Sequence, residues 1–159
     1  MLIVKLLILL IVANGVPQIV RTLLGSRWNY PVDGGLVLKD HYRLFGDSKT
    51  WRGVMAALIV TPLVSLSLLM SWQIGLFVAS GAMAGDLLSS FIKRRLGKVS
   101  SAKATVLDQV PEAIIPALLV YSVFHFPLLI SCVAALLFVL LDITMSPLLF
   151  KWGVRQVPH

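Results

Sequence analysis

Carboxylate, hydroxyl and cationic side chains gather where one apolar stretch of the chain ends and the next begins. Counting along a helix from Asp86, Ser90 follows one turn later and Lys93 two turns later, so all three share a face. Asp108 and Glu112 are also one turn apart, at the start of the following apolar run. Acids that face hydroxyl and cationic groups at a membrane surface suit a metal-bridged phosphate better than they suit packing.

A second group of polar residues precedes another apolar run. Its hydroxyl, ammonium and guanidinium groups follow a glycine and precede a helix start, where anions are favoured. The pattern predicts a nucleotide phosphate site formed by Asp47, Ser48, Lys49, Thr50 and Arg52. It is not a Walker A loop, because Ser48 and Arg43 stand where that motif needs glycines. Anchoring of the helix at the membrane surface explains the same cations equally well.

The acidic cluster also has structural explanations. Asp86 lies inside an apolar run, where an uncompensated charge costs about 2.5–3.5 kcal/mol, and a salt bridge to Lys93 or Arg94 would offset that cost. Asp108 and Glu112 could be acids at a helix N-terminus, each stabilised by about 0.3–1 kcal/mol. The cations that follow Asp86 could mark the end of a membrane helix, and we prefer that explanation for Arg95 and Lys98.

Two further polar features lie within apolar runs. Asn14, Gln18 and Arg21 recur at helical spacing beside Pro17, and we expect this stripe to face the interior of a helical bundle. Asp142 lies deep in the last apolar run. Buried acids often mark proton or ion paths, so a transporter is one alternative, and pairing of Asp142 with Asn14 or another helix is another.

The composition predicts an integral membrane protein that is entirely α-helical. Of the 159 residues, 58% are hydrophobic and 13% are charged, whereas about a quarter of a soluble domain is charged. The apolar residues form runs long enough to cross about 30 Å of hydrocarbon. We therefore predict a single membrane domain, 1–159, with five transmembrane helices at about 2–24, 53–71, 74–91, 107–124 and 127–150.

The cations predict the orientation of these helices. Every lysine and arginine except Lys5 falls within 21–52, 93–103 or 151–155. The positive-inside rule then places the N-terminus outside, the C-terminus in the cytoplasm, and the loops at about 25–52 and 92–106 on the cytoplasmic side of the cell membrane. The net charge of +7 is thus explained by topology, and we expect no nucleic acid partner. The single cysteine, Cys132, excludes a disulfide within the chain.

Several of these motifs occur together in one order. They are Asn14-x-x-Pro17, Pro31-x-Asp33-Gly34-Gly35, the segment from Gly46 to Gly53, Gly85-Asp86-x-x-x-Ser90-Phe91-x-Lys93-Arg94-Arg95, and Asp108-Gln109. Over about 13–116 the chain resembles the CDP-archaeol synthase family, which is similar to the phosphatidate cytidylyltransferases. The resemblance implies a five-helix enzyme that uses CTP and Mg²⁺ to convert an isoprenoid-ether glycerol phosphate into its CDP-lipid, with release of pyrophosphate.

The resemblance also implies roles for individual residues. Asp86, Lys93 and Asp108 would be catalytic, and the metal ligands would be Asp86, Asp108 and Glu112. CTP would be bound by Asp47, Ser48, Lys49, Thr50, Arg52, Ser90 and Arg94. From their spacing, Asn14, Gln18 and Arg21 would line the approach of the lipid phosphate.

The chain departs from the family pattern at the second acid. Relatives tend to place that acid three positions after the first, where this chain has Pro111, and Glu112 follows it. Because i+3 and i+4 lie on one helix face, Glu112 could still reach the same metal.

Three questions about the function stay open. The lipid could be a fatty ester such as phosphatidic acid, and the protein could be a small transporter or an inactive scaffolding relative. A CDP-alcohol phosphotransferase would need the run D-x-x-D-G-x-x-A-R, which the sequence lacks.

Overall fold

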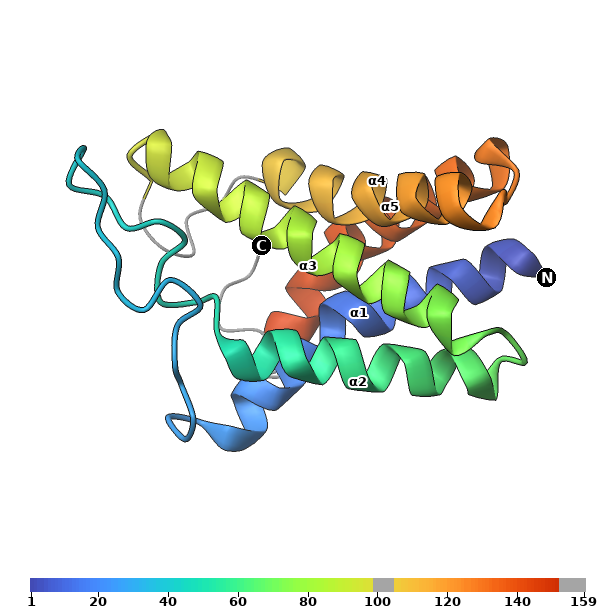
Figure 1. The fold of residues 1–159 in the computed structure, drawn as a ribbon, viewed down its shortest axis with the longest axis horizontal. Helices are drawn as coiled ribbons and strands as arrows, with labels where there is room; N and C mark the ends of the chain where they lie inside the picture. Colours follow the sequence, from blue (N-terminus) through green and yellow to red (C-terminus); the bar gives the residue numbers. More distant parts are fainter. Residues whose placement is uncertain (99–104, 152–159) are drawn as a thin grey trace.

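The computed structural model describes residues 1–98 and 105–151, with side chains for 1–98 and 108–145. Within these ranges the chain forms five helices and two isolated β-bridges, which confirms the all-α prediction (Figure 1). The helices are α1 (Leu2–Leu24), α2 (Trp51–Ser67), α3 (Trp72–Arg95), α4 (Thr105–Phe124) and α5 (Leu128–Lys151).

The boundaries of α2 and α3 differ from those expected from hydrophobicity. α2 begins at Trp51 and ends at Ser67, before the expected 71. α3 extends beyond 74–91 at both ends. It starts earlier because the Ser71 side chain caps it by accepting a hydrogen bond from the Gln73 amide. It continues to Arg95 because cations stabilise the last turn of a helix.

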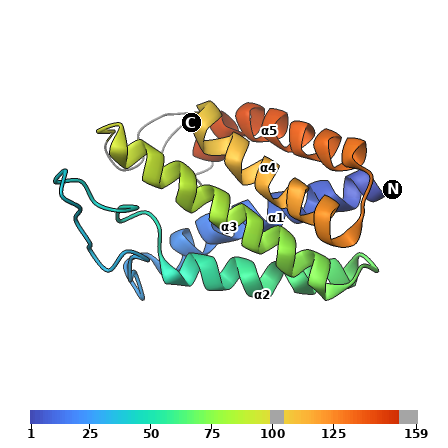
Figure 2. The same ribbon diagram turned by 45° about the horizontal axis from the view of Figure 1, so that its top comes forward.

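α3 is the central element of the bundle. It packs against α1, α2 and α4, while α5 packs against α1 and α4 (Figures 1 and 2). A core of small and aliphatic side chains fills the space between these helices. Among its most buried members are Leu9, Ala13, Ala57, Val78, Ala82 and Val120.

Glycines in α3 let its backbone touch its neighbours. A Cβ atom at Gly81 would lie 2.7 Å from the Cα of Pro116. One turn later, a Cβ at Gly85 would lie 2.4 Å from the carbonyl oxygen of Pro111 and 2.7 Å from the amide nitrogen of Glu112. Small residues allow this close packing of membrane helices. The crossing therefore places the residue after Gly85 directly against the turn of α4 that carries Glu112.

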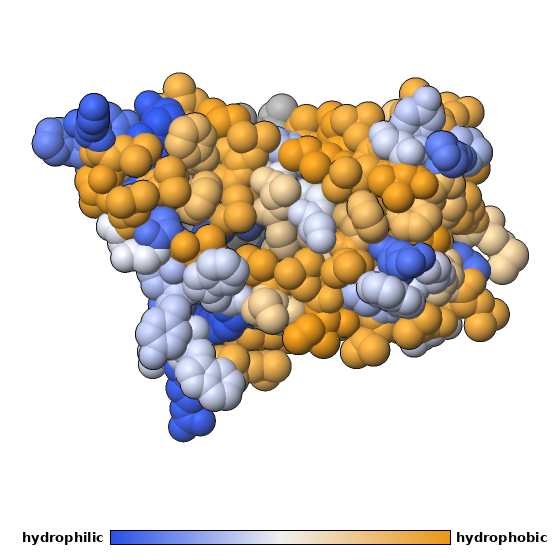
Figure 3. Space-filling view, viewed as in Figure 1, coloured by the Kyte–Doolittle hydropathy of each residue, from blue (hydrophilic) through white to orange (hydrophobic). Residues whose placement is uncertain are grey.

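The helical surface is suited to lipid. Among the described residues, Leu2–Leu24, Trp72–Arg95 and Leu128–Met145 are long and apolar enough to cross a membrane. α2 is apolar and shorter, and its exposed face carries Met55, Ile59, Leu63 and Leu66. Figure 3 shows apolar residues over most of the helical surface in this view. The fold is consistent with an integral membrane protein, and the orientation and the five crossings stay predictions.

The two ends of the bundle differ in character. The N-terminus and the turns that join α2 to α3 and α4 to α5 lie at one end, and the long loop 25–50 lies at the other (Figures 1 and 2). The most extensive hydrophilic surface is at the end with the loop (Figure 3). Arg155, and residues 99–104 of the second expected loop, fall outside the described residues.

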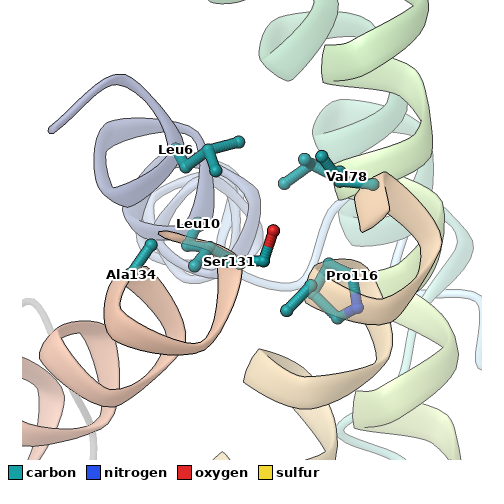
Figure 4. A pocket seen from close by; sticks show the side chains of 8 residues that line it. Leu6, Leu10, Val78, Pro116, Ser131 and Ala134 are labelled. Atoms are coloured by element: carbon teal, nitrogen blue, oxygen red, sulfur yellow. The ribbon is translucent and has the colours of Figure 1, made fainter. Parts of the chain in front are cut away.

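A small apolar pocket lies inside the bundle between α1, α3, α4 and α5. Its lining includes Leu6, Leu10, Val78 and Pro116, and the hydroxyl of Ser131 faces it (Figure 4). Ser131 precedes Asp142 by about three turns of α5. This pocket is therefore separate from the charged end of the bundle.

Candidate active site

The loop and the central helix meet through an ion pair between Lys49 and Asp86. Lys49 lies two residues before α2, where backbone pairing holds it: the Val32 amide donates to the Lys49 carbonyl at 2.7 Å. Burial lowers the pKa of the Lys49 ammonium, but Asp86 and the nearby Glu112 and Asp108 carboxylates outweigh that effect, so the pKa is raised. Lys49 is therefore a cation at neutral pH. The predicted nucleotide phosphate site around Lys49 and the acids around Asp86, which are separate in the sequence, therefore belong to one cluster.

A second ion pair joins α3 to α4. The Lys93 ammonium lies 2.6 Å from the Asp108 carboxylate, and Lys93 is buried although it is in the last turn of α3. Between the two ion pairs, the side chains of Asp86 and Glu112 are in hydrogen-bond contact. Two carboxyl groups this close repel unless a proton or a cation lies between them. The cluster thus consists of three acids with a lysine at either side, contributed by the loop, α3 and α4.

The acids of the cluster have the oxygen ligands that a divalent cation prefers, but only two of them, Asp86 and Glu112, are in contact. Carboxylate oxygens are the ligands that Mg²⁺ prefers, and the contact between Asp86 and Glu112 needs compensating positive charge. Within the described residues, however, no three acids, histidines or cysteines are grouped so that they could hold a metal ion. Lys49 supplies the positive charge at Asp86 in this arrangement. A metal ion bound by Asp86 would therefore replace the Lys49 ammonium.

Arg52, expected at the nucleotide phosphates, makes its contacts within the loop. Its guanidinium donates to the Gly25 carbonyl at 2.9 Å, to the Arg27 carbonyl, and to the Asn29 side-chain oxygen at 2.9 Å. These bonds tie the end of α1 to the start of α2. A phosphate contact by Arg52 stays a prediction, and it would compete with these three acceptors.

The other residues expected at CTP lie in two places. Asp47 pairs with Arg43, and its side chain is 74% exposed. Ser48 and Thr50 are half-buried on either side of Lys49, and Thr50 is the N-cap residue of α2. Ser90 and Arg94 are buried on α3, on the part of the helix that also carries Lys93. Their roles toward CTP stay predictions.

Asp33 organises the loop, a role that the sequence did not reveal. Its fully buried carboxylate pairs with Arg43 and accepts hydrogen bonds from the Phe45 amide at 3.0 Å and the Gly46 amide at 2.9 Å. It also caps its own turn through the Gly35 amide at 3.0 Å. Burial raises the pKa of Asp33, but these hydrogen bonds outweigh burial and hold the pKa well below its usual range. The Asp-Gly-Gly turn was the signal for this role.

Arg95 fastens the loop to the end of α3. Its guanidinium lies 2.7 Å from the Asp40 carboxylate, donates to the Arg43 carbonyl at 2.8 Å, and stacks over the Phe91 ring at 5.2 Å. The sequence favoured a simple boundary cation at this position. The structure shows instead that Arg95 makes specific contacts with the loop that carries Lys49.

The polar stripe of α1 lies beside α2. Asn14, Gln18 and Arg21 are half-buried, and the Asn14 amide donates to the Leu10 carbonyl at 3.0 Å. Pro17, within this stripe, packs against the start of α2, where its Cβ lies 3.2 Å from the Cβ position of Gly53. A role for the stripe in binding a lipid phosphate stays a prediction.

Asp142 of α5 pairs with Gln109 of α4. The Gln109 amide nitrogen donates to the Asp142 carboxylate at 2.7 Å, and Gln109 is 6% exposed. The sequence left open whether the partner of Asp142 was Asn14 or a group on another helix, and the structure shows a residue of α4. Gln109 was noted only as part of a motif, because an amide beside two acids carries no charge pattern of its own.

These features define a helical membrane protein with a cluster of acids and lysines at one end of its bundle. The family model of CarS-like CDP-archaeol synthases matches residues 1–159. The chain therefore belongs to the CDP-archaeol synthase family, which confirms the resemblance found in the sequence.

Individual relatives agree with this assignment. The chain is 33% identical over 155 residues to the CDP-archaeol synthase of Sulfolobus acidocaldarius, a match that covers 93% of this chain and 91% of the relative. It is 40% identical over 89 residues to the CDP-archaeol synthase of Pyrococcus furiosus, a match that covers 50% of this chain and only 53% of the relative. A solved structure of an intramembrane enzyme for archaeal membrane lipid biosynthesis is similar with a TM-score of 0.70 and 28% identity, over 87% of this chain and 91% of that one.

Proposed function

We propose that the protein is a CTP-dependent cytidylyltransferase that acts on a membrane lipid phosphate. The observation that carries the proposal is the pair of lysine–carboxylate contacts, Lys49 with Asp86 and Lys93 with Asp108, at one end of an apolar bundle. Phosphoryl and nucleotidyl transfer need cations for the phosphate oxygens and acids for a metal. Relatives named CDP-archaeol synthases support an archaetidic-type lipid, an isoprenoid-ether glycerol phosphate, as the substrate.

The reaction is an in-line displacement at phosphorus. An oxygen of the lipid phosphate forms a bond to the α-phosphorus of CTP, the bond from that phosphorus to the bridging oxygen of the β-phosphate breaks, and pyrophosphate leaves with the electron pair. The lipid phosphate is already ionised at neutral pH, so it needs no strong base. Lys49 and Lys93 would neutralise the triphosphate, together with Arg94 of the same buried turn.

Asp86 and Glu112 would hold Mg²⁺, with Asp108 close by. When bound, the ion would supply positive charge to the phosphate oxygens and the leaving group. Lys49 would then exchange its carboxylate partner for a phosphate of CTP. In both states the Lys49 ammonium would then face a negatively charged partner.

The cation pattern supports a site on the cytoplasmic side, where CTP is available. The loop that carries Lys49 and the C-terminal turn of α3 both lie at that cation-rich end. Asn14, Gln18 and Arg21 would guide the lipid phosphate along α1 toward it. The transporter alternative was suggested by Asp142 and by the polar stripe of the first helix. Asp142 accepts a hydrogen bond from Gln109 beside the cluster, so it is not an isolated acid on a path across the membrane.

Release of pyrophosphate tests the proposal. Purified protein in detergent would receive CTP and Mg²⁺ with either an archaetidic-type phosphate or phosphatidic acid. We expect turnover with the isoprenoid-ether lipid, loss of turnover in Asp86→Asn, and near wild-type turnover in the control Ser122→Ala, which removes an exposed hydroxyl that donates to the Leu118 carbonyl of its own helix. Turnover with phosphatidic acid alone would contradict the lipid assignment, and no turnover by folded protein with either lipid would contradict the reaction.

A further inference from the structure

The contact between Gln109 and Asp142 brings α5 to the acid cluster. Gln109 directly follows Asp108 and precedes Glu112 by one turn of α4, so its side chain extends from the helix that carries both acids. Its amide nitrogen donates to the Asp142 carboxylate at 2.7 Å. The charge of Asp142 also acts on Glu112. Asp142 is therefore a neighbour of the site, although it lies 30 residues after Glu112 in the sequence.

The partner fixes the orientation of the amide. The NH₂ group of Gln109 donates to Asp142, so the carbonyl oxygen, on the other branch of the amide, is not used in this contact. That oxygen is buried and has no hydrogen-bond donor within the part of the chain that the structure describes. A buried acceptor without a partner has lost its hydrogen bonds to water and is rare in folded proteins. Such an atom beside an acid cluster points to a ligand.

We propose that Asp142 is a positioning residue that holds the Gln109 amide, and that the Gln109 carbonyl oxygen is a further oxygen ligand of the divalent cation held by Asp86 and Glu112. The inference rests on the proposed function. Amide and carboxylate oxygens together suit hard cations such as Mg²⁺. A hydrogen bond that orients a ligand commonly changes metal affinity by about 10-fold to 100-fold. Asp142 thus acts on the cation through Gln109.

Binding of Mn²⁺, followed by its electron paramagnetic resonance signal, tests this inference without turnover. We expect Gln109→Met and Asp142→Leu each to weaken Mn²⁺ binding roughly tenfold. Since the two residues act through one contact, the double variant should bind about as weakly as the weaker single variant. Thr144→Val is the matched control on α5 and should bind Mn²⁺ as the wild type does, because it removes an exposed hydroxyl that donates to the Leu140 and Leu141 carbonyls of its own helix.

A conservative variant separates positioning from charge and from misfolding. Asp142→Asn keeps an acceptor oxygen in place, so we expect Mn²⁺ binding close to that of the wild type. The inference is overturned if a folded Asp142→Leu protein binds Mn²⁺ normally, if the losses of the two single variants add, or if Asp142→Asn binds as weakly as Asp142→Leu. A wild type that turns over CTP while these variants bind normally would overturn only the inference, whereas a wild type that neither binds Mn²⁺ nor turns over CTP would overturn the proposed function as well.

Discussion

Gly85 lets α3 approach α4 at the residue directly before Asp86. A Cβ at this position would lie 2.4 Å from the Pro111 carbonyl oxygen, whereas ordinary van der Waals contacts begin at 3.4 Å. The atoms that it would meet belong to the backbone, so they cannot rotate aside. Gly85→Ala must therefore separate the two helices by about 1 Å at this turn, a displacement typical of overpacking.

This displacement falls on the contact between Asp86 and Glu112. Overpacking in a tight interface costs about 1–3 kcal/mol of stability. A misplacement of about 1 Å in a catalytic group can lower the rate about 100-fold. We therefore expect Gly85→Ala to lose about 100-fold in CTP turnover, with a moderate fall in melting temperature.

Gly75→Ala is the matched control. Its Cβ would lie 2.7 Å from the Pro62 Cα and the Thr61 carbonyl oxygen, a comparable clash on the same helix but at the crossing with α2. Turnover and melting temperature would be measured for both variants in detergent. Both should be destabilised, and only Gly85→Ala should lose most of its turnover. Equal losses of turnover in the two variants, or wild-type turnover in Gly85→Ala, would refute the assignment of this crossing to the site.

Three further predictions concern the loop 25–50 and its contacts. Lys49→Met removes the cation at Asp86, so the melting temperature should fall without divalent ions and rise more with Mg²⁺ than that of the wild type; an equal rise in both proteins would contradict the exchange of counter-ions. Asp33→Asn removes a buried carboxylate with several donors, and amide hydrogen exchange should show about 3 kcal/mol less protection in the loop. Because the pKa of folded Asp33 lies below its unfolded value of about 3.9, its contribution to the stability of the loop should be complete above about pH 5 and should be lost as the pH falls further. If protonation of Asp33 opened the wild-type loop between pH 8 and 6, this prediction would be wrong. Arg52→Ala should speed limited proteolysis after α1, since three acceptors lose their donor, and an unchanged cleavage rate would show that these bonds do not order the loop.

Helix locations followed directly from the sequence, because apolar runs of membrane length have few alternative structures. The helical count from Asp86 also placed the charged groups of α3 on one face. The count could not choose the partner of Asp86. Lys93 is seven residues further on, about 10 Å along the axis, which places it beside Asp108 of α4 rather than beside Asp86. The actual partner, Lys49, comes from a loop whose path depends on the buried carboxylate of Asp33.

The remaining site residues depended on contacts between helices that no local pattern encodes. Asp142 had several polar candidates for a partner, and only the packing of α5 against α4 identifies Gln109. Similarly, the sequence placed Lys49 and Arg52 at one phosphate site and Arg95 at a helix boundary, whereas in the structure Arg52 and Arg95 hold the loop and Lys49 reaches the acids. Sequence therefore predicted which kinds of groups gather at this end of the protein, and tertiary structure assigned their partners.

The central claim is that the cluster around Asp86 transfers a cytidylyl group from CTP to a lipid phosphate. The most direct measurement follows CTP labelled with ³²P at the α-phosphorus, incubated with the protein, Mg²⁺ and an archaetidic-type phosphate, into the lipid fraction. We predict that the label enters the lipid with the wild type and fails to do so with Asp86→Asn. Label at the γ-phosphorus should stay in the aqueous fraction in both, as pyrophosphate with the wild type and as unreacted CTP with Asp86→Asn. Lipid labelling that persists in Asp86→Asn, or γ-label in the lipid, would contradict it.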